Sequence, residues 1–363
     1  MKIAVLLSGG VDSSVALSLL RQQGHTEITA FYLKIWLEED VAFLGDCPWE
    51  EDLKYARAVC EKIGVPLEVI PLQQTYYDRV IAYALNELRA GRTPSPDIFC
   101  NQRIKFGAFW EAIDRSYDRI ATGHYAQIEE KNGYVYLKRA PDPVKDQTYF
   151  LSHLTQEQLS RAIFPIGHLR KKEVRELARR FDLPNKDRKD SQGICFLGRI
   201  SYPQFVKSYL GENPGEIVEL ETGKVLGRHR GYWFYTIGQR QGLGLGNGPW
   251  FVVKKDVTHN RIYVTHKRNI EKWARNRFIV ANVNWIVSPP TTAQIQLKVR
   301  HGPELVTGRL EPLEDGRWLV IMEKKDTGIA PGQFAVFYKD EICLGGGVID
   351  EIDLPSQAEV APG

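Results

Sequence analysis

The chain has 363 residues, of which 43% are hydrophobic and 26% are charged, and its formal net charge at pH 7 is +3. A chain of this length is longer than those that usually fold around one hydrophobic core, so we expect two or three domains. No apolar run approaches the roughly 20 residues of a membrane helix and no signal-peptide pattern precedes the first predicted strand, which excludes a membrane protein and favours a cytoplasmic location. The nearly balanced charge excludes a uniformly basic chain, so any RNA-binding surface has to be local.

The N-terminal segment predicts a phosphate-binding turn. Five apolar residues from Ile3 to Leu7 precede Ser8-Gly9-Gly10, and a run with helical spacing follows, which indicates a buried strand, a tight turn and a helix. Glycine amides and the positive end of the helix together attract an anion. The pattern Ser-Gly-Gly-x-Asp-Ser resembles the PP-loop of the ATP pyrophosphatases, and an ordinary βα turn with a serine cap is the alternative.

The loop differs from a Walker motif in one informative respect. A Walker loop needs Gly-x-x-x-x-Gly-Lys-Ser/Thr, and here no lysine follows the glycines to reach the terminal phosphates. A loop that cradles pyrophosphate in this way suits attack at the α-phosphate, with pyrophosphate leaving whole. We therefore expect an adenylated intermediate.

Strands and helices alternate up to about residue 200. Strands are predicted over 28–35, 67–71 and 119–122. Helices are predicted over 50–63, 75–90, 99–116, 155–162 and 171–180. This order is typical of an α/β fold with a doubly wound parallel sheet, in which ligands bind at the carboxyl ends of strands. A hairpin over 125–139, turning at Asn132-Gly133, interrupts the alternation.

Beyond 202–210 the chain becomes rich in short strands. Glycine and aromatic residues predict a small β-rich module with strands over 215–219, 231–236, 250–253 and 261–265. Alternating segments from about 276 to 353 indicate a barrel or a sandwich. We expect a PP-loop domain over 1–200, a β-rich central module over 201–272 and a C-terminal β-barrel over 273–363. Basic runs at 170–172, 186–189, 254–255 and 267–277 are either local RNA-binding surfaces or solvated faces.

Five cysteines, with no Cys-x-x-Cys pair, argue against a disulfide scaffold and a zinc site, so any functional cysteine acts by its reactivity. Two prolines, Pro94 and Pro96, predict a rigid extended loop before a helix that opens at about Phe99 or Cys100. Cys100 would lie in the first helical turn, where the dipole lowers the pKa of a thiol. Asp97 precedes it by three residues. A core role for Cys100, at the start of an apolar helical face, is the alternative.

Cys195 lies between two glycines after a run of charged residues. We expect this loop to be exposed, which suits a cysteine that collects sulfur at the surface and delivers it inside. A structural role for Cys195 is the alternative. The remaining cysteines, Cys47, Cys60 and Cys343, match no catalytic pattern.

Several further motifs occur in the order and spacing of one known family. They are Ser-Pro-Asp-x-x-Cys-Asn at 95–101, Ala-Thr-Gly-His-Tyr at 121–125, Lys-Asp-Gln-Thr-Tyr-Phe-Leu at 145–151, Gly-Ile-Cys-Phe at 193–196, the run 235–244, Pro-Gly-Gln at 331–333 and Cys-Leu-Gly-Gly-Gly at 343–347. With the PP-loop, they make the chain similar to the bacterial tRNA-specific 2-thiouridylases over nearly its whole length. The resemblance implies ATP-dependent 2-thiolation of the wobble uridine of tRNAs for lysine, glutamate and glutamine, through an O2-adenylated intermediate.

The resemblance also implies which residues bind the substrates. The residues matching the nucleotide site are Leu6, Leu7, Ser8, Gly9, Gly10, Val11, Asp12, Ser13, Leu33 and Gly123. Those matching the site of the target base are Ser95, Pro96 and Asp97, where Ser95 replaces the usual asparagine. Those matching tRNA contacts are His124, Lys145, Asp146, Gln147, Gln333 and, distally, Arg300 and His301. His124 could instead satisfy a backbone carbonyl at the end of its strand.

The implied chemistry uses a persulfide on Cys195, with Cys100 as second thiol and Asp97 as general acid and base. ATP and Mg²⁺ are the implied cofactors, Asp12 positions either the metal or the phosphates, and no metal site made only of protein ligands is expected. The partners are the anticodon stem-loop of tRNA, held by the two β-rich domains, and a persulfide-carrying sulfur donor protein. Less favoured alternatives are an iron–sulfur cluster on Asp97, Cys100 and Cys195, a PP-loop ligase or synthetase, and a non-catalytic RNA-binding protein.

Overall fold

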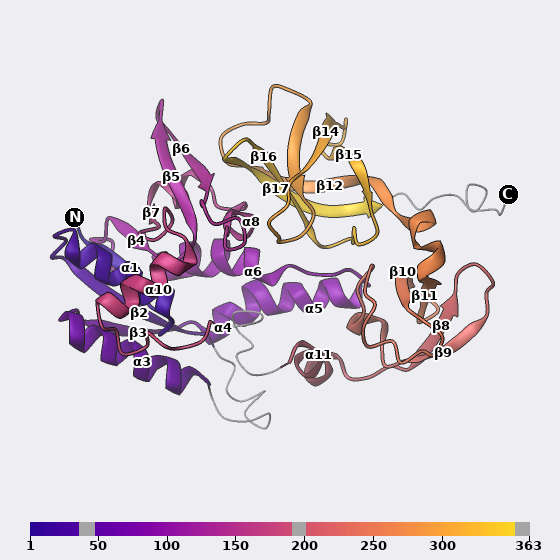
Figure 1. Cartoon of the computed structure of the whole chain (residues 1–363), viewed down its shortest axis with the longest axis horizontal. Helices are drawn as coiled ribbons and strands as arrows, with labels where there is room; N and C mark the ends of the chain where they lie inside the picture. The colour runs from indigo at the N-terminus through magenta and orange to yellow at the C-terminus, as the bar shows by residue number, and fades with distance from the viewer. Residues whose placement is uncertain (36–47, 191–200, 353–363) are drawn as a thin grey trace.

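The structure of the protein is a computed structural model that describes residues 1–35, 48–190 and 201–352. Its N-terminal part is built on a five-stranded parallel sheet in the order β3-β2-β1-β4-β7 (Figure 1). The strands are β1 Ile3–Leu6, β2 Ile28–Lys34, β3 Leu67–Pro71, β4 Arg119–Ala121 and β7 Ala162–Ile163. Strands β2 and β3 lie on one side of β1, and strands β4 and β7 lie on the other. The strand order therefore reverses at β1, so the carboxyl end of β1 lies at a topological switch point.

Helices cover both faces of this sheet, so all four residues of β1 are buried. Ile3, Val5 and Leu7 pack in a cluster with α1 (Val11–Gln22) and α3 (Pro48–Ile63). Ala4 and Leu6 contribute to a second cluster. The helices of that second face are α4 Gln73–Tyr76, η2 Tyr77–Ile81, α5 Ala82–Arg89, α6 Pro96–Phe99, η3 Cys100–Ala108 and α7 Phe109–Ala112. The predicted doubly wound α/β fold is therefore confirmed.

The helix that carries Cys100 begins earlier than its sequence predicted. Pro96 is its first residue, with Ser95 at the N-cap, because the fixed φ of proline suits the first helical position. The helical segment continues through η3, whose turns are of the wide π type, and ends with α7 at Ala112. Cys100 is thus the fifth residue of the helix and lies beyond its first turn.

The predicted hairpin is confirmed as β5 (Ala126–Lys131) and β6 (Tyr134–Arg139). Asn132 and Gly133 form its two-residue turn with φ of 54° and 78°. The sequence did not predict where the hairpin goes: β6 pairs with β17 of the C-terminal part through Leu137 and Cys343, so it extends the sheet of the barrel.

Three shorter helices complete the N-terminal part: α8 Thr148–Leu151, α9 Gln156–Ser160 and α10 Lys171–Arg180. Helix α10 has the predicted bounds, and it packs against α1. The helix predicted over 155–162 ends two residues early, because Ala162 starts the short strand β7 against β4.

The central module has four strands in the order β10-β11-β8-β9. Its elements are α11 Tyr202–Leu210, β8 Gly215–Glu219, β9 Val225–His229, η4 Tyr232–Phe234, β10 Trp250–Asp256, β11 Arg261–His266 and η5 Lys267–Trp273. The strand predicted over 231–236 is wrong, since Tyr232–Phe234 forms a short 3₁₀ helix. Strand β9 was missed, and the other three predicted strands are present.

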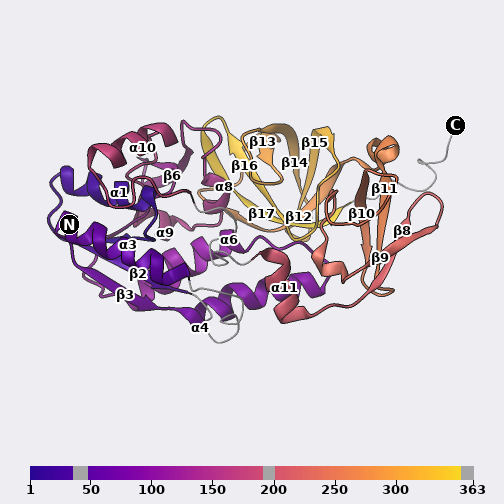
Figure 2. The same cartoon turned by 60° about the horizontal axis from the view of Figure 1, so that its bottom comes forward.

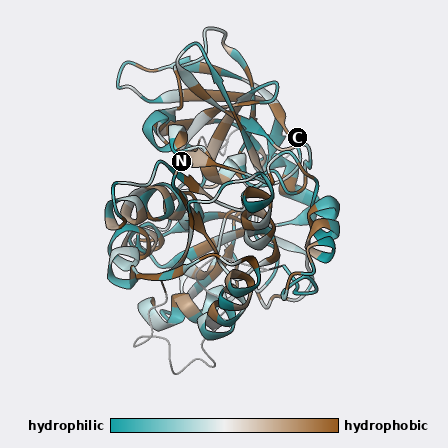
Figure 3. Ribbon diagram, turned by 90° about the vertical axis from the view of Figure 1, so that its left-hand side faces the viewer, coloured by the Kyte–Doolittle hydropathy of each residue, from teal (hydrophilic) through white to brown (hydrophobic). Residues whose placement is uncertain are grey.

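The C-terminal part is an antiparallel barrel, closed by pairing of β12 with β17 (Figure 2). Its strands are β12 Arg275–Trp285, β13 Gln294–Lys298, β14 Val306–Pro312, β15 Trp318–Asp326, β16 Phe334–Lys339 and β17 Ile342–Ile352. Hydrophobic segments lie inside the layers and hydrophilic ones on the outer helices (Figure 3). Among the described helices, none combines the length and apolar character needed to cross a bilayer.

Candidate active site

The loop after β1 has the geometry of an anion site. Gly9 has a φ of +74°, and a Cβ atom there would lie 2.2 Å from the carbonyl oxygen of Asp52, so only glycine fits. Gly10 is the N-cap of α1 and offers no capping side chain, which leaves the first amides of the helix open to a ligand. The hydroxyls of Ser8 and Ser13 lie 3.2 Å apart across the loop.

Gly123 packs directly against this loop from the end of β4. A Cβ atom on Gly123 would lie 2.7 Å from the amide nitrogen of Ser13 and 2.8 Å from the carbonyl carbon of Asp12. The ends of β1 and β4 therefore meet at the switch point, where an α/β sheet binds its ligand. Leu33, near the end of β2, is half-buried against the core on the other side of β1.

Asn185 and Arg188 brace the loop from a distant part of the chain. The Nδ2 group of Asn185 donates to the carbonyl oxygen of Gly9 at 2.8 Å and to the hydroxyl of Ser14 at 2.9 Å. Arg188 donates to the same carbonyl at 3.1 Å and pairs with Asp52. Sequence reasoning placed neither residue at the loop, although Arg188 belongs to the basic run 186–189, because their partners in the loop are more than 170 positions away along the chain.

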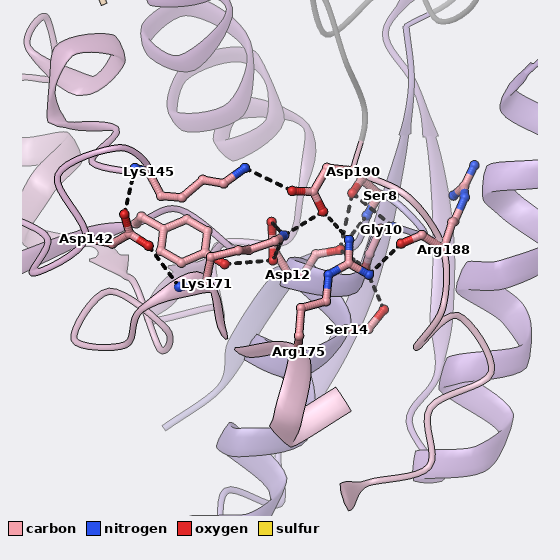
Figure 4. A network of polar contacts seen from close by, with 12 residues as sticks. Ser8, Gly10, Asp12, Ser14, Asp142, Lys145, Lys171, Arg175, Arg188 and Asp190 are labelled. Atoms are coloured by element: carbon pink, nitrogen blue, oxygen red, sulfur yellow. Dashed lines mark hydrogen bonds and ion pairs between the residues drawn. The ribbon is translucent and has the colours of Figure 1, made fainter. Parts of the chain in front are cut away.

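A cluster of charged side chains lies beside the loop (Figure 4). Lys171, the first residue of α10, pairs with Asp12 at 2.7 Å and with Asp190 at 2.8 Å. Lys145 pairs with Asp190 at 2.9 Å, and Arg175 also pairs with Asp190. Hydrogen bonds from Lys171 and Lys145 hold the pKa of Asp190 well below its ordinary value, although burial acts in the opposite direction. The sequence predicted Asp12 at the nucleotide site, Lys145 as a tRNA contact and a basic run at 170–172, but it did not predict that these residues meet at Asp190.

Asp142 holds the backbone of Lys145 and of Lys171 in place. Its carboxylate accepts from the amides of Lys145 at 3.2 Å and Lys171 at 3.1 Å, and also from the amide of Val144. The hydroxyl of Tyr125 donates to Asp12 at 2.9 Å. The cations beside the loop are therefore held by the fold.

The segment from Thr93 to Asp97 lies where the three parts of the chain meet. The amide of Thr93 donates to Pro331 in the barrel at 2.8 Å, and its hydroxyl contacts Thr236 of the central module at 3.2 Å. Gly332 packs so closely that a Cβ atom would lie 2.8 Å from the carbonyl oxygen of Thr93. Gln333, a predicted tRNA contact, follows directly in the sequence.

Cys100 corrects one expectation from the sequence. Cys100 is 1% exposed in the core, and this burial raises the pKa of its thiol to about 11. The predicted lowering of the pKa by the helix dipole is wrong, because the helix starts at Pro96 and desolvation dominates at the buried thiol. Asp97 adds to the effect, while Lys105 acts against it.

Two predicted tRNA contacts are enclosed by the protein. Asp146 is fully buried, and its carboxylate accepts from Thr148 at 2.9 Å and Lys298 at 3.2 Å. His124 is buried and its Nδ1 lies 2.7 Å from the hydroxyl of Thr122, and burial holds its pKa well below the ordinary value. Their direct contact with tRNA stays a prediction.

The remaining predicted residues lie at the surface of the junction or outside the described chain. The ring of His301 stacks on Phe150, with centroids 4.7 Å apart, and its Nε2 lies 3.1 Å from the carbonyl oxygen of Asp146. Arg300 pairs with Asp326. Cys195 lies outside the described residues, so its distance from Cys100 stays untested. Within the described ranges, no group of three His, Cys, Asp or Glu residues could hold a metal ion.

The fold and the loop define the class of the protein. A doubly wound parallel sheet whose first strand ends in Ser-Gly-Gly-x-Asp-Ser, at the switch point, is a PP-loop nucleotide-binding domain of the HUP type. Three family models match the chain. They are the tRNA methyl transferase HUP domain over 1–199, the tRNA methyl transferase PRC-barrel domain over 203–266 and the aminomethyltransferase beta-barrel domain over 275–349.

The chain belongs to the tRNA-specific 2-thiouridylase family. It is 49% identical over 356 residues to tRNA-specific 2-thiouridylase MnmA 1 of Bacteroides thetaiotaomicron, an alignment that covers 96% of this chain and 99% of that protein. The tRNA-specific 2-thiouridylase MnmA of Parabacteroides distasonis is 47% identical over 359 residues, which cover 97% of this chain and 99% of that protein. The predicted family, and with it the class of tRNA sulfurtransferase, is confirmed.

Solved structures add only a distant likeness. The U34-tRNA thiolase NcsA from Methanococcus maripaludis with its [4Fe-4S] cluster matches with a TM-score of 0.34 and 18% identity, over 57% of this chain and 63% of that chain. Similarity at this level says nothing about the metal content of the present protein.

Proposed function

We propose that this protein uses ATP to replace O2 of the wobble uridine with sulfur in tRNAs for lysine, glutamate and glutamine. The observation that carries the proposal is the loop Ser8–Ser13, with its obligatory glycine, its uncapped helix and Gly123 packed against it. This geometry supports a nucleotide phosphate at the loop. The family of the chain supports tRNA as the second substrate.

Adenylation turns the uridine O2 into a leaving group. The O2 atom attacks the α-phosphorus in line, the bond to the bridging oxygen breaks, and pyrophosphate leaves. The amides of the loop and the end of α1 stabilise the charge that develops on the phosphates. Bound Mg²⁺ would neutralise phosphate oxygens. The carboxylate of Asp12, one-third exposed beside the loop, fits an ion that binds through one or two carboxylates and the substrate phosphates.

Sulfur then enters from a persulfide on Cys195, supplied by a sulfur donor protein. The terminal sulfur attacks C2, AMP leaves, and a mixed disulfide joins C2 to Cys195 through the transferred sulfur. The Cys100 thiolate attacks the sulfur of Cys195, which releases the thiouridine and leaves a Cys100–Cys195 disulfide. An external thiol reductant supplies the two electrons that reopen it. Asp97 exchanges protons with the base as general acid and base.

The rigid segment from Thr93 to Asp97 supports a pocket for a base that has left the anticodon stack. It lies against both β-rich parts, through Pro331 and Thr236. In the proposal these parts hold the anticodon stem through phosphate contacts, so affinity falls as salt rises.

The test is mass analysis of wobble nucleosides after incubating the protein with ATP, sulfide and unmodified tRNA. We expect 2-thiouridine to form only with ATP. With a persulfide donor and the reductant that wild type needs to turn over, Cys195→Ser abolishes sulfur acceptance and Cys100→Ser stops multiple turnover, whereas Cys60→Ser, on the buried face of α3, retains activity. Full activity of either catalytic variant would refute the cysteine assignment, and absence of 2-thiouridine with all substrates present would refute the function.

An iron–sulfur cluster on Asp97, Cys100 and Cys195 remains the less favoured route, because carboxylate ligation is unusual for such clusters. The two routes differ in a simple observable. A colourless, iron-free preparation, made anaerobically, is expected to retain full activity under the persulfide route and to have none under the cluster route.

A further inference from the structure

The charged cluster beside the loop has a feature that the reaction scheme leaves unused. Three cations, Lys171 and Arg175 of α10 and Lys145 of the turn before α8, converge on the single carboxylate of Asp190 (Figure 4). Ion pairs at protein surfaces usually join one cation to one anion and contribute little. Here the side chains are only partly exposed, at 37% for Lys145, 15% for Lys171 and 23% for Arg175. Such a convergence is what a site for a multiply charged anion requires.

The position of the cluster identifies the anion that suits it. Lys171 also pairs with Asp12, the second residue of α1, at 2.7 Å, so its ammonium group lies at the end of the helix where the loop binds phosphate. The loop itself contains no lysine for the outer phosphates. The missing charge is thus supplied by α10, a segment about 160 residues further along the chain.

We propose that Lys171 and Arg175, with Lys145, bind the β- and γ-phosphates of ATP, and that Asp190 occupies these cations when no nucleotide is bound. The inference rests on the proposed function, since it assumes an ATP site at the loop. It adds the residues that bind the pyrophosphate leaving group. It also makes Asp190 a competitor of the ATP phosphates for the three cations.

The surrounding groups support an exchange of anions. The backbones of Lys145 and Lys171 are fixed by Asp142, so the cations stay in place when their partner changes. Lys171 pairs with both Asp12 and Asp190. If the carboxylate of Asp190 moves away, the ammonium group of Lys171 therefore still has Asp12 as a partner. A phosphate chain accepts charge-assisted hydrogen bonds from all three cations.

Helix α10 offers a matched control. Lys172 follows Lys171 directly and carries the same charge, but its side chain is 89% exposed and lies 3.9 Å from Glu176 on the outer face. Lys171→Met and Lys172→Met therefore change net charge equally, and only the first removes a cation of the cluster.

The experiment measures binding of ATP and of AMP, both with Mg²⁺, to the full-length protein by calorimetry. AMP lacks the β- and γ-phosphates, so Lys171→Met should weaken ATP binding by about 10-fold or more while changing AMP binding less than about 2-fold. Lys172→Met should leave both unchanged. Unaltered AMP binding shows that the variant is folded and that its loop is intact.

Asp190→Asn provides the opposite change. Removing the competing charge should tighten ATP binding several-fold, about 3- to 10-fold, and leave AMP binding unchanged. Equal ATP affinity in Lys171→Met and wild type, equal losses for ATP and AMP, or weaker ATP binding in Asp190→Asn would each overturn the inference. If wild-type protein binds neither nucleotide, the proposed function fails and the inference falls with it.

Discussion

At the scale of single residues, Cys100 shows how burial overrides a local helix effect. With a pKa of about 11, its thiol is almost entirely protonated at neutral pH, and about one molecule in 10,000 carries the thiolate at pH 7. In the absence of substrates the thiol therefore reacts slowly at neutral pH. This property suits a cysteine that reacts only in the disulfide-forming step, because an exposed thiolate would be oxidised before that step.

The prediction is that alkylation of Cys100 by iodoacetamide rises about tenfold per pH unit from pH 7 to 9.5, without a plateau. The sign follows from the raised pKa, since the thiolate fraction keeps growing until pH reaches about 11. Peptide mass analysis of timed samples measures the rate. Protein in denaturant is the control, and there the rate should level near the ordinary thiol pKa of about 8.5. A plateau below pH 8 in folded protein would mean that the thiol is activated after all.

At the scale of elements, the turn before α8 is tied to the barrel by a buried ion pair. The side chain of Lys298, on β13, is 1% exposed, and it lies 3.2 Å from the fully buried carboxylate of Asp146. Arg139 approaches the same carboxylate at 3.4 Å. The contact fixes the turn that carries Lys145 and Gln147, so Asp146 supports its neighbours from within the protein.

Lys298→Met should destabilise the protein by about 3–5 kcal/mol, because it removes the nearer of the two cations that pair with a fully buried carboxylate. Adding Asp146→Asn should recover much of the loss, since the remaining amide needs only hydrogen bonds, such as the one from Thr148. Urea denaturation followed by circular dichroism measures both. Arg309→Met is the control: its pair with Glu311 is 63% exposed on the arginine side and should be worth less than about 1 kcal/mol. Equal losses in the two single variants would contradict the account.

Local patterns in the sequence predicted elements well where local forces decide them. Strands β3 and β8 and helix α10 have the predicted bounds, because alternation and helical spacing are set by neighbouring residues. Strand β7 was missed because two residues become a strand only beside β4. The same limit applies to the site: the loop could be read from Ser8 to Ser13, whereas Asn185 and Lys171 reach it through folding over more than 150 positions.

At the scale of the whole molecule, the segment from Thr93 to Asp97 joins the three parts of the chain. The parallel sheet lies on one side of this junction, and the barrel and the central module lie on the other (Figures 1 and 2). Arg92, just before the segment, pairs with Asp350 of β17 at 2.9 Å. The position of the predicted base-binding residues thus depends on how the domains pack. A change in the barrel should therefore displace the segment that contacts the base and leave the nucleotide loop unaffected.

Gly332→Ala tests this dependence. Its φ is +89°, and its Cβ atom would lie 2.8 Å from the carbonyl oxygen and 2.9 Å from the amide of Thr93, so the loops must separate. Gly316→Ala is the matched control, because Gly316 has a φ of +82° in a barrel turn with nothing within 4 Å. Both variants carry the backbone cost of alanine at positive φ, about 1–2 kcal/mol, and only Gly332→Ala displaces the segment at the junction.

We expect Gly332→Ala to raise the KM for tRNA about 10-fold or more, since a 1 Å displacement of a positioning segment can cost up to about 10²-fold. AMP binding should match wild type, because the atoms nearest the added Cβ belong to Arg92 and Thr93 and not to the loop after β1. Gly316→Ala should leave both quantities unchanged. Steady-state thiolation and calorimetry provide the two measurements. Equal tRNA defects in both variants would assign the effect to barrel stability, and a defect in AMP binding would mean that the base segment and the nucleotide loop are coupled through the fold.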